Sequence, residues 1–147
     1  MLFRSLLLET DGQGRQGSFL ASEPAFQFLK SLQARDLVIP VVGNLAGTTA
    51  MPAIAAFLAK ARVPLSAFYT SNVEFYLFRE GSFPRFVDNV ARLPRHPQSL
   101  IIRSVFGGAA ATSPGYGSAS VTQRTEDLVT GFAAGRFRRY PDLVSGS

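Results

Sequence analysis

The sequence of 147 residues contains no cysteine and only one histidine. Without thiols the chain can form neither a disulfide framework nor a thiolate metal site. His96 lies in the segment Pro-Arg-His-Pro and has no second histidine with which to share a metal ion. We therefore predict no metal site, and we interpret His96 as a solvated loop residue.

Long hydrophobic runs are also missing. No apolar stretch approaches the roughly 20 residues that a membrane-spanning helix needs. The short run Leu6 to Leu8 is followed at once by Glu9 and Asp11, which an export signal would not tolerate. These absences predict a cytoplasmic protein with no membrane partner.

Charged residues are few, at 17%, whereas 46% of residues are hydrophobic, which predicts a folded chain of one domain. The net charge of +5 favours loose contact with anions without establishing a nucleic-acid partner. The one tight basic cluster is Arg136, Arg138 and Arg139. We interpret it as a solvated helix end, where cations suit the helix dipole, ahead of nucleic-acid binding.

The stretch Leu37 to Val42 is the most distinctive feature of the sequence. Its six apolar residues are too few for a helix and lack alternation, so they predict a strand buried on both faces. Pro40 cannot donate a ladder hydrogen bond, so one side of that strand must need no donor. A loop bracketed by Gly43 and Gly47 follows, and helical spacing then predicts a helix from Ala50 to Lys60.

The remaining elements follow the same plan. Ser22-Glu23-Pro24 is typical of a helix start, and the helical spacing continues to about Ala34. Ser71 and Glu74 have the spacing of a capping box, as do Ser120 and Gln123, which would open a helix through Phe132. The other predicted elements are a strand at 65–70, a short helix to about 78, a helix around 83–90, a strand at 100–106, and a tail docked by Phe137 and Tyr140.

Alternating strands and helices predict an α/β fold with a parallel sheet. About three strands with flanking helices make a partial doubly wound sheet, smaller than is usual for this class. We predict a single partial α/β domain over 1–147. Its segments are a lead-in at 1–21, an α/β core at 22–106, a flexible Gly/Ala loop at 107–119, and a C-terminal helix and tail at 120–147.

Ligands of open α/β sheets bind beyond the carboxyl ends of the strands. Three loops fall there: Gly43 to Gly47, Tyr69 to Glu74, and Arg103-Ser104. We expect them to form a rim suited to a polar or phosphorylated small molecule. The candidate ligand-binding residues are Asn44, Ser71, Asn72, Glu74 and Arg103.

Each candidate also has a structural interpretation. Capping alone explains Ser71 and Glu74, whereas Asn72 is needed by neither half of the capping box. A guanidinium inside an apolar strand needs a partner, so we expect Arg103 to pair with Glu74 or Asp142. The string Gly12-x-Gly14-x-x-Gly17 follows no buried strand, and we attribute it to chance. No catalytic constellation stands out.

Several ordered motifs resemble an uncharacterised bacterial family whose fuller members look like a Rossmann-type, methyltransferase-like domain. The motifs are Ser18 to Glu23, Leu37 to Gly47, Ala67 to Glu74, Ile102 to Ser104, and Ala134 to Val144. The family pattern has an aspartate and a Pro-Lys pair in the first loop, where this sequence has Asn44 and Thr48-Thr49.

The resemblance implies that this chain is the C-terminal half of such a domain, with the N-terminal half missing. That half would hold a cofactor such as S-adenosylmethionine, and this chain would not be active alone. The edge beside Leu37 to Val42 would then be exposed, which predicts self-association or a partner chain. The alternative hypothesis is a non-catalytic α/β binding or protein-interaction module.

Overall fold

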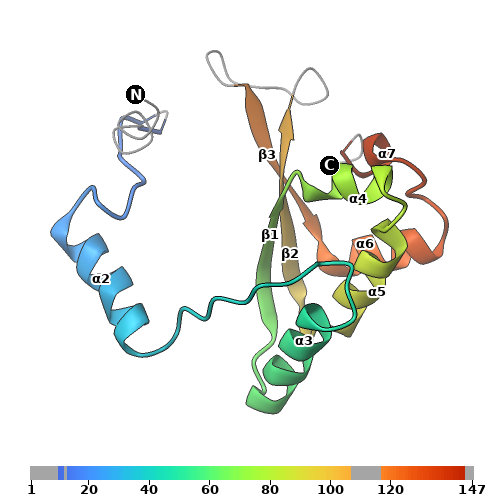
Figure 1. Ribbon diagram of the computed structural model, residues 1–147. Coiled ribbons are helices and arrows are strands. Elements are labelled where there is room, and N and C mark those ends of the chain that lie inside the picture. Colours follow the sequence, from blue (N-terminus) through green and yellow to red (C-terminus); the bar gives the residue numbers. More distant parts are fainter. Residues whose placement is uncertain (1–9, 12, 107–116, 145–147) are drawn as a thin grey trace. The chain divides into compact units, whose positions relative to one another are not determined.

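The computed structural model describes residues 10–11, 13–106 and 117–144 (Figure 1). The chain divides into two compact units, residues 1–41 and residues 42–147. Their helices and strands are α2 (Glu23–Ala34), α3 (Ala50–Ala61), β1 (Leu65–Ser71), α4 (Val73–Arg79), α5 (Phe83–Arg92), β2 (Arg95–Phe106), β3 (Ser118–Arg124), α6 (Thr125–Ala133) and α7 (Tyr140–Val144).

The first unit contains one described helix, α2, which begins where the sequence predicts. The Ser22 hydroxyl accepts a hydrogen bond from the amide of Ala25 at 3.3 Å, satisfying a free donor of the first turn. Upstream, Thr10 and Gln16 form an isolated antiparallel bridge around a turn. None of the described residues of this unit is buried, so α2 has no core of its own.

The prediction of a buried strand at Leu37 to Val42 is wrong. None of these residues belongs to a strand, and the five large apolar side chains among them are about half exposed or more. A β-strand needs a neighbouring strand to pair with by hydrogen bonds, and among the described residues this segment pairs with no strand. The apolar composition of Leu37 to Val42 therefore predicted a strand without showing whether a second strand is present to pair with it.

The second unit is built on a three-stranded sheet in the order β1-β2-β3. Strands β1 and β2 are parallel, and β2 and β3 are antiparallel, so the predicted parallel sheet is mixed. Ile102 of β2 aligns with Tyr69 of β1 and with Thr122 of β3, and the pairing of β1 with β2 is irregular on either side of Ala67 to Tyr69. The α/β class and the strands β1 and β2 are confirmed.

Strand β3 replaces the helix start predicted at Ser120. The spacing of Ser120 and Gln123 resembles a capping box, but both residues lie within β3, and α6 begins later, at Thr125. The alternation of half-buried and exposed residues along Ser118–Arg124 is that of a strand with one covered face. The predicted flexible loop at 107–119 lies mostly outside the described residues.

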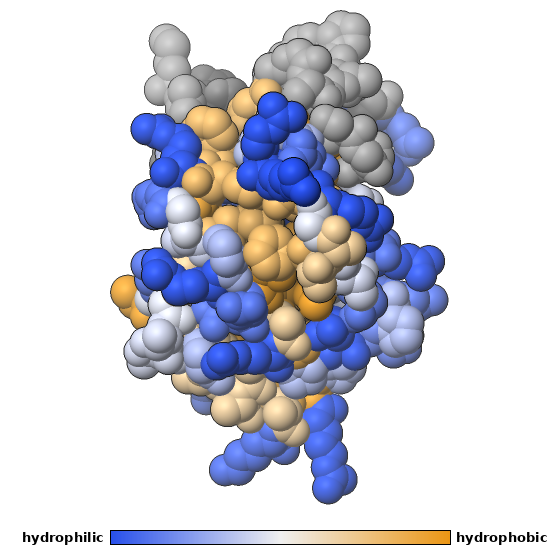
Figure 2. Space-filling model, turned by 90° about the vertical axis from the view of Figure 1, so that its right-hand side faces the viewer, coloured by the Kyte–Doolittle hydropathy of each residue, from blue (hydrophilic) through white to orange (hydrophobic). Residues whose placement is uncertain are grey.

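Helices α4 to α7 lie on one side of the sheet (Figure 1). Ile101 and Val105 of β2 point into this layer and are at most 1% exposed, as is Phe86 of α5. Phe137 and Tyr140 pack against the same core, which confirms the predicted docking of the tail. Viewed from the helix side, hydrophobic residues gather in the upper middle of the surface between hydrophilic ones (Figure 2).

The loop from Gly43 to Gly47 is held by a side chain of α5. The Asn89 amide nitrogen donates to the carbonyl oxygens of Leu45 and Gly47, at 2.9 and 2.8 Å. A Cβ atom at Gly43 would overlap the Cβ of Ala50, so glycine is required there for a close approach. These contacts fix the entry to α3 within the second unit.

Candidate functional site

The carboxyl ends of the parallel strands β1 and β2 lie at one edge of the sheet. The last residue of β1, Ser71, has φ +54°, in the left-handed region that residues with a Cβ rarely adopt. Such strain persists only where the surroundings enforce it, and it is concentrated at functional sites. The turn from β1 into α4 is therefore a first pointer to function.

The predicted capping box at this turn does not form. Asn72 is the residue that precedes α4, and its side chain makes no capping hydrogen bond. Glu74 is fully buried and instead contacts Thr70 and Arg103. A cap would have placed this carboxylate at the exposed helix start, whereas its actual partners lie in the sheet.

Glu74 and Arg103 form a buried ion pair. The Arg103 Nε atom donates to Glu74 Oε1 at 2.8 Å, and the Thr70 hydroxyl donates to Glu74 Oε2 at 3.0 Å. Glu74 is thus the partner that Arg103 was expected to need, whereas Asp142 caps the amides of Arg138 and Arg139.

The pair is costly to keep in the protein interior. Burial raises the pKa of Glu74 despite the neighbouring Arg103 charge and the Thr70 hydrogen bond. The Nη1 and Nη2 atoms of Arg103 are shielded from solvent and find no hydrogen-bond partner among the described residues. Such buried, incompletely satisfied donors call for a structural or functional reason.

A cavity of about 290 Å³ lies where β1 passes into α4 and where β2 ends. It is lined by Asn72 and by four aromatic residues, Phe75, Tyr76, Phe106 and Tyr140. Burial and then the Glu74 carboxylate raise the pKa of the Tyr140 phenol, whose ring lines the cavity. We call this space the aromatic cavity.

A hydroxyl cluster lies on the opposite face of the same strands. The Tyr69 hydroxyl and Ser104 Oγ are 2.9 Å apart. Hydrogen bonds from Ser104 and then from Ser71 lower the pKa of Tyr69. Because Tyr69 is 60% exposed, this cluster is a surface feature and not an enclosed site.

The structure brings four of the five candidate residues together. Ser71, Asn72, Glu74 and Arg103 meet at the carboxyl ends of β1 and β2. Of the five candidates only Asn72 lines the aromatic cavity, and Asn44 lies in a different loop. Its side-chain oxygen accepts from the amide of Ala46 at 2.8 Å and stabilises its own loop.

The aromatic lining was missed from sequence because its members come from three segments of the chain, and only the adjacent pair Phe75-Tyr76 is a local signal. On the short helix α4 these two side chains are 41% and 48% exposed. Large aromatic residues left exposed near a strand end are a usable indication of a binding surface.

The sequence pattern of the domain of unknown function DUF7790 matches residues 4–139. The chain belongs to this family. No curated protein matches this DUF7790 chain. In its described part no three acidic, histidine or cysteine side chains group into a metal site. None of the described helices is long and apolar enough to cross a bilayer.

Proposed function

We propose that this DUF7790 chain is a methyltransferase-like, Rossmann-type α/β module of bacterial origin that binds a small polar aromatic molecule in the aromatic cavity. The observation that carries the proposal is Asn72. Its amide lines the cavity, makes no cap, and forms no hydrogen bond with the described residues. An amide so placed is free to orient a ligand at the carboxyl ends of parallel strands, where open α/β sheets bind theirs.

The lining defines the chemical class of the ligand. Aromatic side chains stack on or meet the edge of planar rings. Phe75 already makes edge contacts with Tyr76 and Tyr140, at centroid distances of 5.4 and 5.6 Å, so a ring entering the cavity would join an existing cluster. Asn72 offers one donor pair and one acceptor. A single ring with a hydroxyl, amino or carbonyl substituent satisfies both features and matches a cavity of about 290 Å³.

S-adenosylmethionine, the cofactor that the resemblance implies, does not fit the described residues. Rossmann-type nucleotide sites need a glycine turn between a strand and its helix. Only Asn72 separates the end of β1 from α4, and Gly14 and Gly17 lie near an exposed bridge with no strand-to-helix connection. What this chain's own residues supply is the site for a second molecule, such as a methyl acceptor.

Ligand-observed NMR of the full chain with phenol, indole and a nucleobase tests the aromatic cavity. We expect saturable binding of at least one ring, weakened about tenfold by Asn72→Ala because one hydrogen bond to the ligand is lost. Gln98→Ala, which removes an exposed amide outside the cavity, is the matched control. Binding that both substitutions leave unchanged, or no binding of any ring, would contradict the proposal.

The free edge of β1 supports a second candidate function, an interaction module. Among the described residues β1 pairs only with β2, so its other edge presents unpaired backbone groups. Light scattering over a range of concentrations should show self-association, which Ala67→Lys should suppress by placing a charge on the edge strand. A chain that stays monomeric throughout excludes self-association, and it leaves the ring-binding result untouched.

A further inference from the structure

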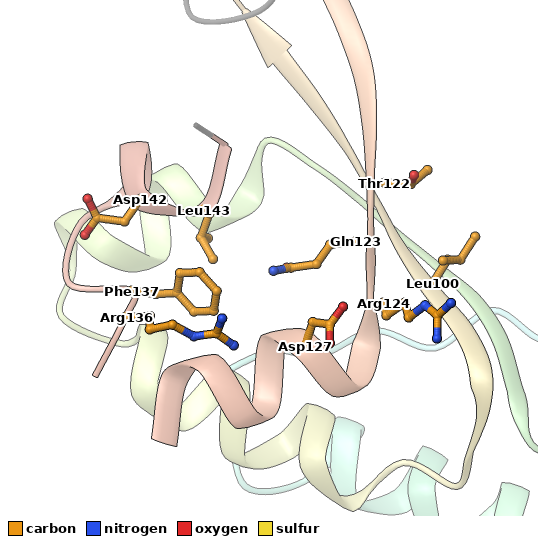
Figure 3. Close-up of a pocket in the computed structure, with 9 residues that line it drawn as sticks. All are labelled: Leu100, Thr122, Gln123, Arg124, Asp127, Arg136, Phe137, Asp142 and Leu143. Carbon is orange, nitrogen blue, oxygen red and sulfur yellow. The ribbon is translucent and has the colours of Figure 1, made fainter. Parts of the chain in front are cut away.

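A second and larger cavity lies away from the aromatic cavity, where β3 passes into α6. It has a volume of about 610 Å³, within the range of roughly 300 to 1,000 Å³ typical of small-molecule sites. Its walls come from Leu100 of β2, from β3, the start of α6, the segment after α6, and α7 (Figure 3). We call it the junction cavity.

Five side chains converge on this space. Gln123 extends into it from β3, Asp127 borders it from α6, and Arg136, Phe137 and Leu143 face it from the C-terminal segment (Figure 3). By contrast, Asp142 points away from the space in the same view, and its carboxylate already accepts from the amides of Arg138 and Arg139.

Opposite charges face the junction cavity without pairing with each other. In the part of the chain that the structure describes, neither Asp127 nor Arg136 has an ion-pair partner within 4.0 Å. The neighbouring acid Glu126 is engaged differently, because it pairs with Arg95 at 2.7 Å. Arg124 also lines the cavity, but its side chain points away from this space in Figure 3, which leaves the Asp127 carboxylate and the Arg136 guanidinium facing it.

The Gln123 side chain extends from β3 into the same space, with its amide nitrogen foremost (Figure 3). Its Oε1 atom is shielded from solvent and finds no hydrogen-bond donor among the described residues. Because Oε1 is shielded, a ligand in the cavity meets the amide nitrogen of Gln123 and not this oxygen. The amide nitrogen of the same side chain can donate to a ligand carboxylate.

The apolar wall is built by a close approach at Gly131 of α6. A Cβ atom there would lie 2.5 Å from the Phe137 ring and 2.8 Å from Arg136 Nη2. Only glycine therefore lets both side chains lie against the helix, where the Arg136 guanidinium is 5.8 Å from the centre of the Phe137 ring. The Phe137 ring and the Arg136 guanidinium therefore lie side by side at the cavity wall.

We propose that the junction cavity binds a free α-amino acid with a large apolar side chain. The ammonium group is recognised by Asp127, the carboxylate by Arg136 and the amide nitrogen of Gln123, and the side chain by Phe137 and Leu143. A ligand with only one charge would leave either the carboxylate or the guanidinium of the cavity unsatisfied. This site is independent of the aromatic cavity and does not rest on the function proposed for it.

Calorimetric titration of the full chain with L-phenylalanine tests the assignment, with phenylpropionate and phenethylamine as analogues that each lack one charge. We expect L-phenylalanine to bind, and each analogue to bind about tenfold more weakly, because one charged hydrogen-bonded contact is lost. No heat from L-phenylalanine at concentrations up to roughly 10 mM, or equal affinity for all three probes, would overturn the proposal.

Two substitutions locate the site. Asp127→Asn should weaken the binding of L-phenylalanine about tenfold and leave the affinity for phenylpropionate unchanged. Arg136→Gln should likewise weaken the binding of L-phenylalanine about tenfold, but it should leave the affinity for phenethylamine unchanged. Glu80→Gln, an exposed acid outside the cavity, is the control and should change nothing. Affinities that both cavity substitutions leave unaltered in variants with the wild-type circular dichroism spectrum would place the amino acid elsewhere and refute this site.

Discussion

Residues 10–41 contain phenylalanine, leucine, isoleucine and valine much as residues 42–144 do, yet only the second region buries them. Phe28 of α2 is 65% exposed, whereas Phe86 of α5 is fully buried and lies 6.0 Å from the Phe83 ring. The difference is not in residue type but in the presence of a sheet against which a helix can pack. An amphipathic pattern thus shows which face of a helix can be buried, and the rest of the fold determines whether a surface is present to bury it.

The largest effect should come from a matched pair of phenylalanine truncations. Phe86→Ala should lower the free energy of unfolding by about 4 kcal/mol, because it leaves a cavity in the core. Phe28→Ala should change it by no more than about 0.5 kcal/mol, because this ring packs on no core. Urea denaturation of both variants measures the difference. Similar losses for the two would show that Phe28 is buried in solution.

Two arginine–carboxylate pairs of equal length extend the comparison. The pair of Arg103 and Glu74 is fully buried, and that of Arg15 and Asp11 is exposed, both at 2.8 Å. Arg103→Met should cost about 3 kcal/mol, because it strands a buried carboxyl group. Arg15→Met should leave the unfolding free energy unchanged, because water and salt screen its pair.

A double variant distinguishes the net contribution of the buried pair to the free energy of unfolding from the loss caused by removing one partner. Glu74→Leu combined with Arg103→Met should recover most of the stability lost by Arg103→Met alone, because apolar replacements remove both buried charges. Double-mutant analysis by urea denaturation provides the measurement. If the two single losses simply add, Glu74 and Arg103 do not interact as described.

The pH dependence of stability should carry the signature of Glu74. Its pKa is raised in the folded protein above the ordinary value of 4.5, so between these two values the folded state holds a proton that the unfolded state has released. Stability contributed by this proton is complete below pH 4.5 and falls as pH rises through the folded pKa. Glu74→Gln should remove that part of the slope, and an unchanged slope would exclude Glu74 as its origin.

The smallest effect on overall stability should come from the cap of α2. Ser22→Ala removes the hydrogen bond to the Ala25 amide and should loosen α2 locally by about 1 kcal/mol. Amide hydrogen exchange should accelerate in α2, while the urea midpoint stays constant because the second unit dominates it. Ser31→Ala is the control on the same helix, since that hydroxyl only bonds back to Phe28. A shift of the urea midpoint in Ser22→Ala would contradict this prediction, because it would show that the stability of α2 is coupled to that of the second unit.

Local signals predicted local structure. Helices α2, α3 and α5 followed from apolar spacing and start signals, and β1 and β2 followed from short apolar runs between breakers. The strand predicted at Leu37 to Val42 is wrong because an apolar run does not specify a neighbouring strand with which to form hydrogen bonds. Strand β3 was missed because its residues are mostly polar and its serine and glutamine imitate a helix start.

The site was predictable only as far as its parts are close in sequence. Ser71 and Asn72 follow directly from the rule that ligands meet strand ends. Glu74 was chosen for capping, but it pairs with a residue 29 positions away, which no local pattern encodes. The junction cavity depends on contacts between β3, α6 and the C-terminal segment and carries no signal in any one of them.

The contact between Gly43 and Ala50 has an evolutionary consequence. The space between their backbones holds one methyl group and not two. Gly43→Ala alone should therefore be harmful, and Ala50→Gly in the same chain should rescue it by moving the methyl group to the other side. Among relatives, these two positions are expected to exchange glycine and alanine together, so that either residue alone would look variable while the pair keeps a constant volume.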